Sequence, residues 1–135
     1  MAPQLNFDEL VQDKRVHRKI YTEAEVFDAE MERIFERTWV FVGHESEVAA
    51  SGDYKTVTIG TQPAIMTRDE DGGVNVLMNR CMHRGSTICQ EQRGNSSYFR
   101  CWYHGWTYTN RGELVGLPYA AGYGKSFDRS KFSLV

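Results

Sequence analysis

Two short segments combine a cysteine with a histidine at spacings typical of metal-binding loops. One residue separates Cys81 from His83, and two residues separate Cys101 from His104. Each segment follows residues of β-strand character, and each has a glycine just beyond its histidine. Because glycine permits sharp turns, the two segments can close over a metal from opposite sides. We therefore expect Cys81, His83, Cys101 and His104 to be metal ligands.

Two kinds of metal site use two thiolates and two imidazoles. In a Rieske [2Fe–2S] cluster two histidines replace two cysteines on one iron, and the four residues allow this arrangement. A structural zinc ion is the alternative, since zinc also accepts two Cys and two His. Zinc fingers usually pair like with like, whereas each segment here mixes one cysteine with one histidine, which favours the cluster. The third cysteine, Cys89, is interpreted as a small buried hydrophobic residue rather than a further ligand.

Length and composition are those of one globular domain. The chain has 135 residues, 41% hydrophobic and 25% charged, which disfavours disordered, collagen-like and coiled-coil interpretations. A formal net charge of -2 gives no general attraction to nucleic acid or anionic lipid. No apolar run approaches the roughly 20 residues of a membrane span, and three cysteines without a secretion signal indicate thiolate chemistry rather than disulfides. We expect a cytoplasmic protein that binds neither nucleic acid nor membrane.

The N-terminal part is expected to contain one helix. Thr22 and Glu25 have the spacing of a capping box, and apolar residues repeat after them at helical intervals. This pattern predicts an amphipathic helix from about Thr22 to Trp39 with a solvated charged face. The first 20 residues show no period and are expected to form an extended arm that packs on a neighbour or stays loose.

From Gly43 onward the sequence has the character of a mainly β domain. Glycines recur between short segments rich in Val, Ile, Thr and Tyr. Asp71-Gly72-Gly73 and Asn110-Arg111-Gly112 are typical of hairpin turns. The expected strands are Tyr54–Ile59, Pro63–Thr67, Val74–Met78, Tyr98–Arg100, Trp106–Thr109 and Glu113–Leu117.

Four motifs carry a close resemblance to a known family. They are Trp39–Glu47, Gly52–Tyr54, Asn79–Gly85 (NRCMHRG) and Cys101–Tyr108 (CWYHGWTY). In their order and approximate spacing they resemble the Rieske domain of the large (α) subunits of bacterial aromatic-ring-hydroxylating dioxygenases. The likeness covers nearly the whole chain, and C-x-H with C-x-x-H, flanked by HRG and YHGW, is a highly specific signature.

The resemblance implies a fold, a cofactor and a ligand set. The fold is a Rieske-type antiparallel β domain with a small cluster-binding subdomain, preceded by an N-terminal helix. Cys81 and Cys101 would bind the inner iron of a [2Fe–2S] cluster, and His83 and His104 the outer iron. The expected parts are an N-terminal arm and helix (1–40), the Rieske domain (41–118) and the start of a linker (119–135).

The resemblance also implies one-electron transfer, as the N-terminal portion of a dioxygenase α subunit. Electrons from NADH would arrive through a reductase or a ferredoxin and pass to a mononuclear iron that activates O2. That iron lies in a longer catalytic domain, expected to belong to a neighbouring subunit of a full-length oligomer and to be absent from this chain. With two histidines assigned to the cluster, only His17 and His44 remain, so no catalytic residue is expected here. A self-standing Rieske ferredoxin is the alternative, which the first 40 residues disfavour.

Four aromatic residues lie next to the proposed ligands in sequence. Trp102, Tyr103, Trp106 and Tyr108 are expected to shield the cluster from water. Tyr108 is also expected to offer a hydrogen bond to sulfur, which would raise the reduction potential.

The remaining polar residues near the motifs receive structural interpretations. His44 is interpreted as a structural hydrogen-bonding residue and His17 as a surface residue. Arg84 is interpreted either as a surface charge or as an ion-pair partner that fixes the first loop, and the ion pair is slightly favoured. The acidic residues Asp69–Asp71 are interpreted as a solvated hairpin tip.

Overall fold

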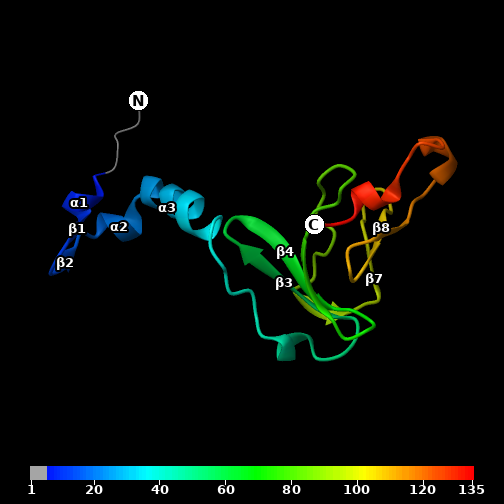
Figure 1. Cartoon of the computed structure of the whole chain (residues 1–135), viewed down its shortest axis with the longest axis horizontal. Coiled ribbons are helices and arrows are strands. Elements are labelled where there is room, and N and C mark those ends of the chain that lie inside the picture. The colour runs from blue at the N-terminus through cyan, green and yellow to red at the C-terminus, as the bar shows by residue number, and fades with distance from the viewer. Residues whose placement is uncertain (1–5) are drawn as a thin grey trace. The chain divides into compact units, whose positions relative to one another are not determined.

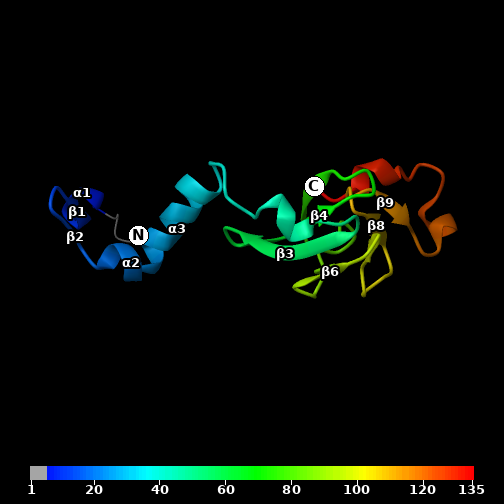
Figure 2. The same cartoon turned by 90° about the horizontal axis from the view of Figure 1, so that it is seen from below.

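The computed structural model describes residues 6–135, and the chain divides into two compact units, Met1–Val40 and Phe41–Val135. Figure 1 and Figure 2 show the first unit in blue to cyan and the second in the later colours of the bar. Among the described residues, no helix has both the length and the apolar character needed to cross a membrane.

Short helices and a small hairpin make up the first unit. Its elements are α1 (Phe7–Leu10), β1 (Val11–Gln12), β2 (Arg15–Val16), α2 (Lys19–Thr22), α3 (Ala24–Glu30) and a π-helical turn (Met31–Phe35). Strands β1 and β2 pair antiparallel. The expectation of an extended arm is therefore wrong for residues 6–20, and residues 1–5 lie outside the described part of the chain.

The expected helix from Thr22 to Trp39 begins later and ends earlier. Glu23 has an extended backbone (φ -89°, ψ 130°) between α2 and α3. Thr22 does not cap α3, because its hydroxyl donates to the Arg18 carbonyl inside α2 at 3.4 Å. Threonine hydroxyls often bond back to the preceding helical turn in this way. The helical segment then ends with the π-helical turn at Phe35.

Two antiparallel sheets form the second unit. The first has the strand order β5-β4-β3-β6 and the second the order β7-β8-β9. The first sheet consists of β3 (Asp53–Ile59), β4 (Gln62–Arg68), β5 (Val74–Met78) and β6 (Arg93–Asn95). The second consists of β7 (Tyr98–Arg100), β8 (Thr107–Thr109) and β9 (Leu114–Gly116). Every pair in both sheets is antiparallel, which confirms the predicted fold class.

Each expected strand is present, with ends close to those expected from the sequence. The structure also contains strand β6, which nothing in the sequence pattern indicated. Its residues, Arg93–Asn95, are exposed and carry no apolar alternation. They pair with the start of β3 at the edge of the sheet, where pairing depends on neighbouring backbone rather than on buried side chains.

One hydrophobic core joins the two sheets. Ile65 and Leu77 of the first sheet share this core with Phe99, Tyr108 and Leu114 of the second. Burial of these side chains removes apolar surface from water, the main stabilising contribution in a domain of this size. The core therefore fixes the two sheets relative to each other.

The segment after β9 packs against the same core. It contains 3-10 turns at Ala120–Tyr123 and Arg129–Phe132 and returns to the sheets as the red end of the ribbon in Figure 1. Leu134 is buried in the core, and its N–H donates to the Gly112 carbonyl at 2.7 Å. Residues 119–135, interpreted from the sequence as the start of a linker, thus pack against the core of the second unit.

Candidate metal centre

The first predicted metal-binding loop is a tight turn closed by its own backbone. The Gly85 N–H donates to the Cys81 carbonyl at 2.8 Å, and the Cys81 N–H donates to the Ser86 carbonyl at 2.8 Å. Gly85 has a φ of 74°, in the left-handed region that glycine adopts without strain. This turn directs the Cys81 side chain into the core.

The second loop repeats this backbone pattern. The Gly105 N–H donates to the Cys101 carbonyl at 2.9 Å, and the Cys101 N–H donates to the Trp106 carbonyl at 2.8 Å. The φ of Gly105 is 72°, close to the value at Gly85. The two loops therefore share one backbone frame, although histidine lies one place later in the second loop.

The structure brings the four predicted residues together. Cys81 and Cys101 are 3% and 2% exposed, and the Cys101 thiol lies close enough to contribute to the raised pKa of the Cys81 thiol. The imidazole rings of His83 and His104 meet edge to face, with centroids 4.6 Å apart. The thiols are thus inside the domain, whereas the imidazoles lie toward a pocket on its surface, lined in part by His83, Cys101 and His104.

The ring of His83 is held on one face and lacks a partner at one nitrogen. The indole ring of Trp106 stacks on it, with centroids 4.9 Å apart. The Nδ1 atom of His83 is buried and has no hydrogen-bond partner among residues 6–135. A buried polar atom without a partner is unfavourable, and coordination to a metal would satisfy it. Burial lowers the pKa of His83, which favours the neutral imidazole that binds metals.

The two cysteines also suit an iron–sulfur cluster. Burial raises the pKa of the Cys81 thiol, although a hydrogen bond from Tyr108 acts in the opposite direction. A thiol that coordinates a metal loses its proton, so metal binding here would release protons. No three His, Cys, Asp or Glu side chains among residues 6–135 converge around a point as they would on a single metal ion. A Rieske cluster requires only pairs, two cysteines on one iron and two histidines on the other.

Tyr108 lies in the core beside the first loop. Its hydroxyl is 3.3 Å from the Cys81 sulfur and accepts a hydrogen bond from the Met82 N–H at 3.1 Å. Since the backbone N–H occupies a lone pair, the phenol proton is free to point at sulfur. Burial raises the pKa of Tyr108, so the phenol stays protonated and able to donate. The predicted hydrogen bond to sulfur is present.

Strand β9 has a β-bulge opposite Thr107 and Tyr108. Between β8 and β9 the pairing shifts at Thr107 and Tyr108, which oppose Gly116 and Leu114 and leave Val115 without a partner. Bulges bend a strand and re-aim its side chains, and they occur often beside functional sites. The bulge therefore bends β9, while Tyr108 of β8 keeps its pairing with Phe99 and reaches Cys81 of the first loop.

The predicted aromatic shield is only half present. Trp106 and Tyr108 are buried, at 2% and 0% exposure, but Trp102 and Tyr103 are 66% and 52% exposed. The second loop projects these two rings outward, where they stack on each other at 5.5 Å. Tyr103 also contacts the His104 ring at 3.9 Å between centroids. Water is excluded from the inner side of the site but not from the side of His104.

Outside the four ligand candidates, three sequence interpretations agree with the structure. Cys89 is buried, and its sulfur lies 3.5 Å from the Glu91 carbonyl. His44 caps the 3-10 turn Glu45–Val48 by accepting a hydrogen bond from the Ser46 N–H at 3.2 Å. His17 is exposed.

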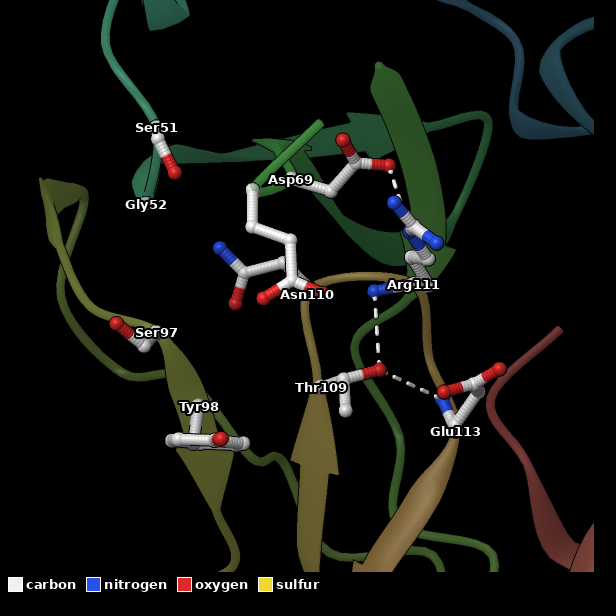
Figure 3. A pocket seen from close by; sticks show the side chains of 10 residues that line it. Ser51, Gly52, Asp69, Ser97, Tyr98, Thr109, Asn110, Arg111 and Glu113 are labelled. Carbon is white, nitrogen blue, oxygen red and sulfur yellow. Dashed lines mark hydrogen bonds and ion pairs between the residues drawn. The ribbon is translucent and has the colours of Figure 1, made fainter. Parts of the chain in front are cut away.

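The favoured ion pair of Arg84 and the expected solvation of Asp69 are wrong, whereas Glu70 and Asp71 are exposed as expected. Arg84 is exposed and has no acidic partner within the described part of the chain. Asp69 is buried at 6% exposure rather than solvated. Its carboxylate accepts from the Gly73 N–H at 2.7 Å, and Arg111 binds it at 3.0 Å from the other hairpin turn (Figure 3). Hydrogen bonds hold the pKa of Asp69 below its usual value, and the bond from Asn75 has the largest effect.

The ion pair of Asp69 and Arg111 links the turns of the two sheets, and sequence reasoning missed it. The turn sequence Asp69–Gly73 indicates that an aspartate can accept hydrogen bonds from its own turn. Nothing local in the sequence identifies an arginine from a distant turn as its partner. The polar pocket beside this pair contains none of the four ligand candidates.

Comparison with known proteins assigns the chain to a family. Residues 38–127 match the Rieske [2Fe-2S] domain, and the chain belongs to this family. It is 44% identical over 117 residues to the N,N-dimethyl phenylurea N-demethylase subunit alpha of Sphingobium sp. (strain YBL2), covering 86% of this chain and 26% of that protein. It is 42% identical over 116 residues to the toluate 1,2-dioxygenase subunit alpha of Pseudomonas putida, covering 84% and 26%.

A solved structure shows the same likeness. Naphthalene 1,2-dioxygenase from Rhodococcus sp., bound to indole, aligns with a TM-score of 0.84 and 45% identity. The alignment covers 89% of this chain and 28% of that one. The chain thus spans about a quarter of the length of the relatives it matches, and the matching part is the Rieske portion of their α subunits.

Proposed function

We propose that Cys81, His83, Cys101 and His104 hold the Rieske cluster and that the domain transfers one electron at a time. The observation that carries the ligand assignment is the shared backbone frame of the two loops, which brings two buried thiols and two imidazoles to one place. The buried Nδ1 atom of His83, which lacks a hydrogen-bond partner among the described residues, supports it.

A bound [2Fe–2S] cluster supplies reversible one-electron chemistry. The residues of this chain hold and insulate it. Tyr108 donates a hydrogen bond to the Cys81 sulfur, which stabilises negative charge on that ligand. Trp106 covers one face of His83 and keeps water from the inner side. The exposed ring of His104 gives a partner access to the outer side of the site.

The partners follow from this role. We infer that a reductase or a ferredoxin delivers electrons, and that a mononuclear iron in the catalytic domain of a neighbouring subunit accepts them in a full-length oligomer. On this proposal, residues 41–118 are the Rieske domain, 1–40 precede it, and 119–135 lead toward the catalytic domain. The three free cysteines support a reducing compartment, and we place the protein in the cytoplasm.

The ligand assignment is tested by electron paramagnetic resonance with iron and sulfide analysis. Cys81→Ser and Cys101→Ser should abolish the Rieske signal of the reduced protein, because each removes a thiolate. His83→Cys and His104→Cys should destroy the signal or convert it to that of a different cluster. Cys89→Ser is the matched control and should leave spectrum and iron content unchanged.

Two outcomes would contradict the proposal. Loss of the signal in Cys89→Ser with its retention in Cys101→Ser would reassign the ligand set. A colourless protein that contains zinc but no iron or sulfide would favour a structural zinc site. The electron-transfer role is tested by adding NADH to the cluster-loaded protein with and without a reductase. We expect the cluster to be reduced only when the reductase is present.

A further inference from the structure

The side chain of Asn79 forms hydrogen bonds across the base of the first loop. Its Oδ1 atom accepts from the N–H groups of Ile88 at 3.1 Å and Cys89 at 2.9 Å. Its Nδ2 atom donates to the Cys89 carbonyl at 2.7 Å. Asn79 is 3% exposed, so these bonds form where water does not compete.

These bonds join the two ends of the segment that contains Cys81 and His83. Asn79 precedes the loop, and Ile88 and Cys89 follow it. The backbone N–H of Asn79 donates to the Pro63 carbonyl at 2.9 Å, which anchors the closed loop to β4 of the first sheet. One planar amide thus fixes the distance between the entry and the exit of the loop.

Apart from the two backbone hydrogen bonds that close its turn, the exposed part of the loop has little other support. Met82, Arg84 and Gly85 are exposed, and Arg84 forms no ion pair with the described residues. The Tyr108 hydroxyl contacts the Cys81 sulfur and the Met82 N–H near the start of the loop. Asn79 holds the opposite end, so a change there would let the loop move relative to the second loop.

We propose that Asn79 is a positioning residue that sets the placement of Cys81 and His83 against Cys101 and His104. This rests on the proposed ligand set. Reduction potential and paramagnetic spectrum depend on how ligands and their hydrogen bonds are arranged around the cluster. Asn79 therefore influences both properties without touching the cluster.

The second unit contains a matched control. Asn110 is also buried, at 5% exposure, and its Nδ2 atom also donates to backbone carbonyls, of Arg68 at 3.2 Å and Ser96 at 3.0 Å. It lies beside the Asp69 and Arg111 pair, in a pocket that contains no ligand candidate (Figure 3). Loss of Asn110 should lower stability for similar reasons but leave both loops in place.

The experiment compares Asn79→Ala, Asn79→Asp and Asn110→Ala in the cluster-loaded protein. Readouts are the g-values of the reduced protein, the midpoint potential, iron content and the urea midpoint. We expect both Asn79 variants to shift the g-values and the potential, because each removes the Nδ2 hydrogen bond to the Cys89 carbonyl. We expect Asn110→Ala to lose stability while keeping the wild-type spectrum and potential.

The outcomes separate the two proposals. If wild-type protein shows no Rieske signal, the proposed ligand set fails, whatever Asn79 does. If wild-type protein shows the signal, loss of the cluster from a folded Asn79 variant supports the positioning role. Wild-type g-values and potential in both Asn79 variants overturn it. The proposal is also overturned if both Asn79 variants unfold while Asn110→Ala stays folded. Asn79 would then stabilise the whole domain and not the first loop in particular.

Discussion

The indole ring of Trp106 lies nearly parallel to the imidazole ring of His83, with 11° between their planes. The rings of Tyr123, Phe127 and Phe132 meet the indole edge-on, at centroid distances of 6.0, 6.1 and 5.7 Å. The Trp106 Nε1–H also donates to the Tyr123 hydroxyl at 3.2 Å. The C-terminal segment therefore supports a side chain that contacts a proposed ligand.

Replacing Trp106 with Phe should destabilise the domain by about 2 kcal/mol, from one lost hydrogen bond and a smaller buried ring. Trp102→Phe is the control, because this side chain is 66% exposed and exposed substitutions usually stay within about 0.5 kcal/mol. Urea unfolding followed by circular dichroism measures both. Equal midpoints in the two variants would contradict the role given to Trp106.

Replacing Tyr108 with Phe should lower the reduction potential. The variant loses the hydrogen bond to the Cys81 sulfur, so the additional negative charge of the reduced state is less stabilised. It also leaves the Met82 N–H without its acceptor, at a cost of about 1 to 3 kcal/mol in stability. Protein-film voltammetry checks the potential. Tyr98→Phe, in an exposed ring of β7, should leave it unchanged.

Replacing Gly105 with Ala should destabilise the second loop more than the same change in an open turn. Gly105 and Gly72 both have positive φ, 72° and 86°, a conformation that costs an alanine about 1 to 2 kcal/mol. A Cβ at Gly105 would also lie 3.0 Å from Pro118 Cγ, whereas one at Gly72 meets nothing within 4 Å. Thermal unfolding of the two variants isolates this contact, and a larger loss at Gly72 would argue against it.

The stability of the second unit should fall in acid partly through Glu47. Hydrogen bonds from Lys55 and from the His44 N–H, with Arg93 also in contact, lower the pKa of Glu47 from 4.5 to about 2. A depressed folded-state pKa gives stability that is present above the unfolded value and lost as pH falls below it. The loss should therefore develop between about pH 4.5 and pH 2.

The variant Glu47→Gln separates this contribution from other effects of acid. Its stability should be lower than that of wild type near neutral pH, and the difference should shrink as pH falls through that window. Urea midpoints of both proteins between pH 3 and pH 7 measure the difference. A constant difference across the range would show that the Glu47 carboxylate does not carry the effect.

The sequence was sufficient where local patterns decide structure. Alternating residues and glycine turns located β3, β4, β5 and β7 because hairpin registers depend on neighbouring residues. The spacing of the Cys and His residues led to the four side chains that the structure brings together. Helical periodicity also indicated α3, although not its beginning.

Features that depend on distant contacts were not predictable. Glu23 has an extended backbone one residue after the expected start of the helix, and no local rule placed the break there. Asp69 looks like any solvated turn residue until Arg111 approaches from another sheet. The packing of the C-terminal segment depends on Trp106, which only the folded second loop presents.

The two predicted metal-binding loops share one backbone frame but differ in the position of the histidine. The same turn therefore places the cysteine at one position and accommodates a histidine at either of two positions. Exchanging one loop sequence for the other should preserve the chain trace while changing the side chain order. Proteins with two copies of the first loop, or two of the second, would have a more symmetric arrangement of the proposed ligands. The difference between the two natural loops can therefore be varied in protein design.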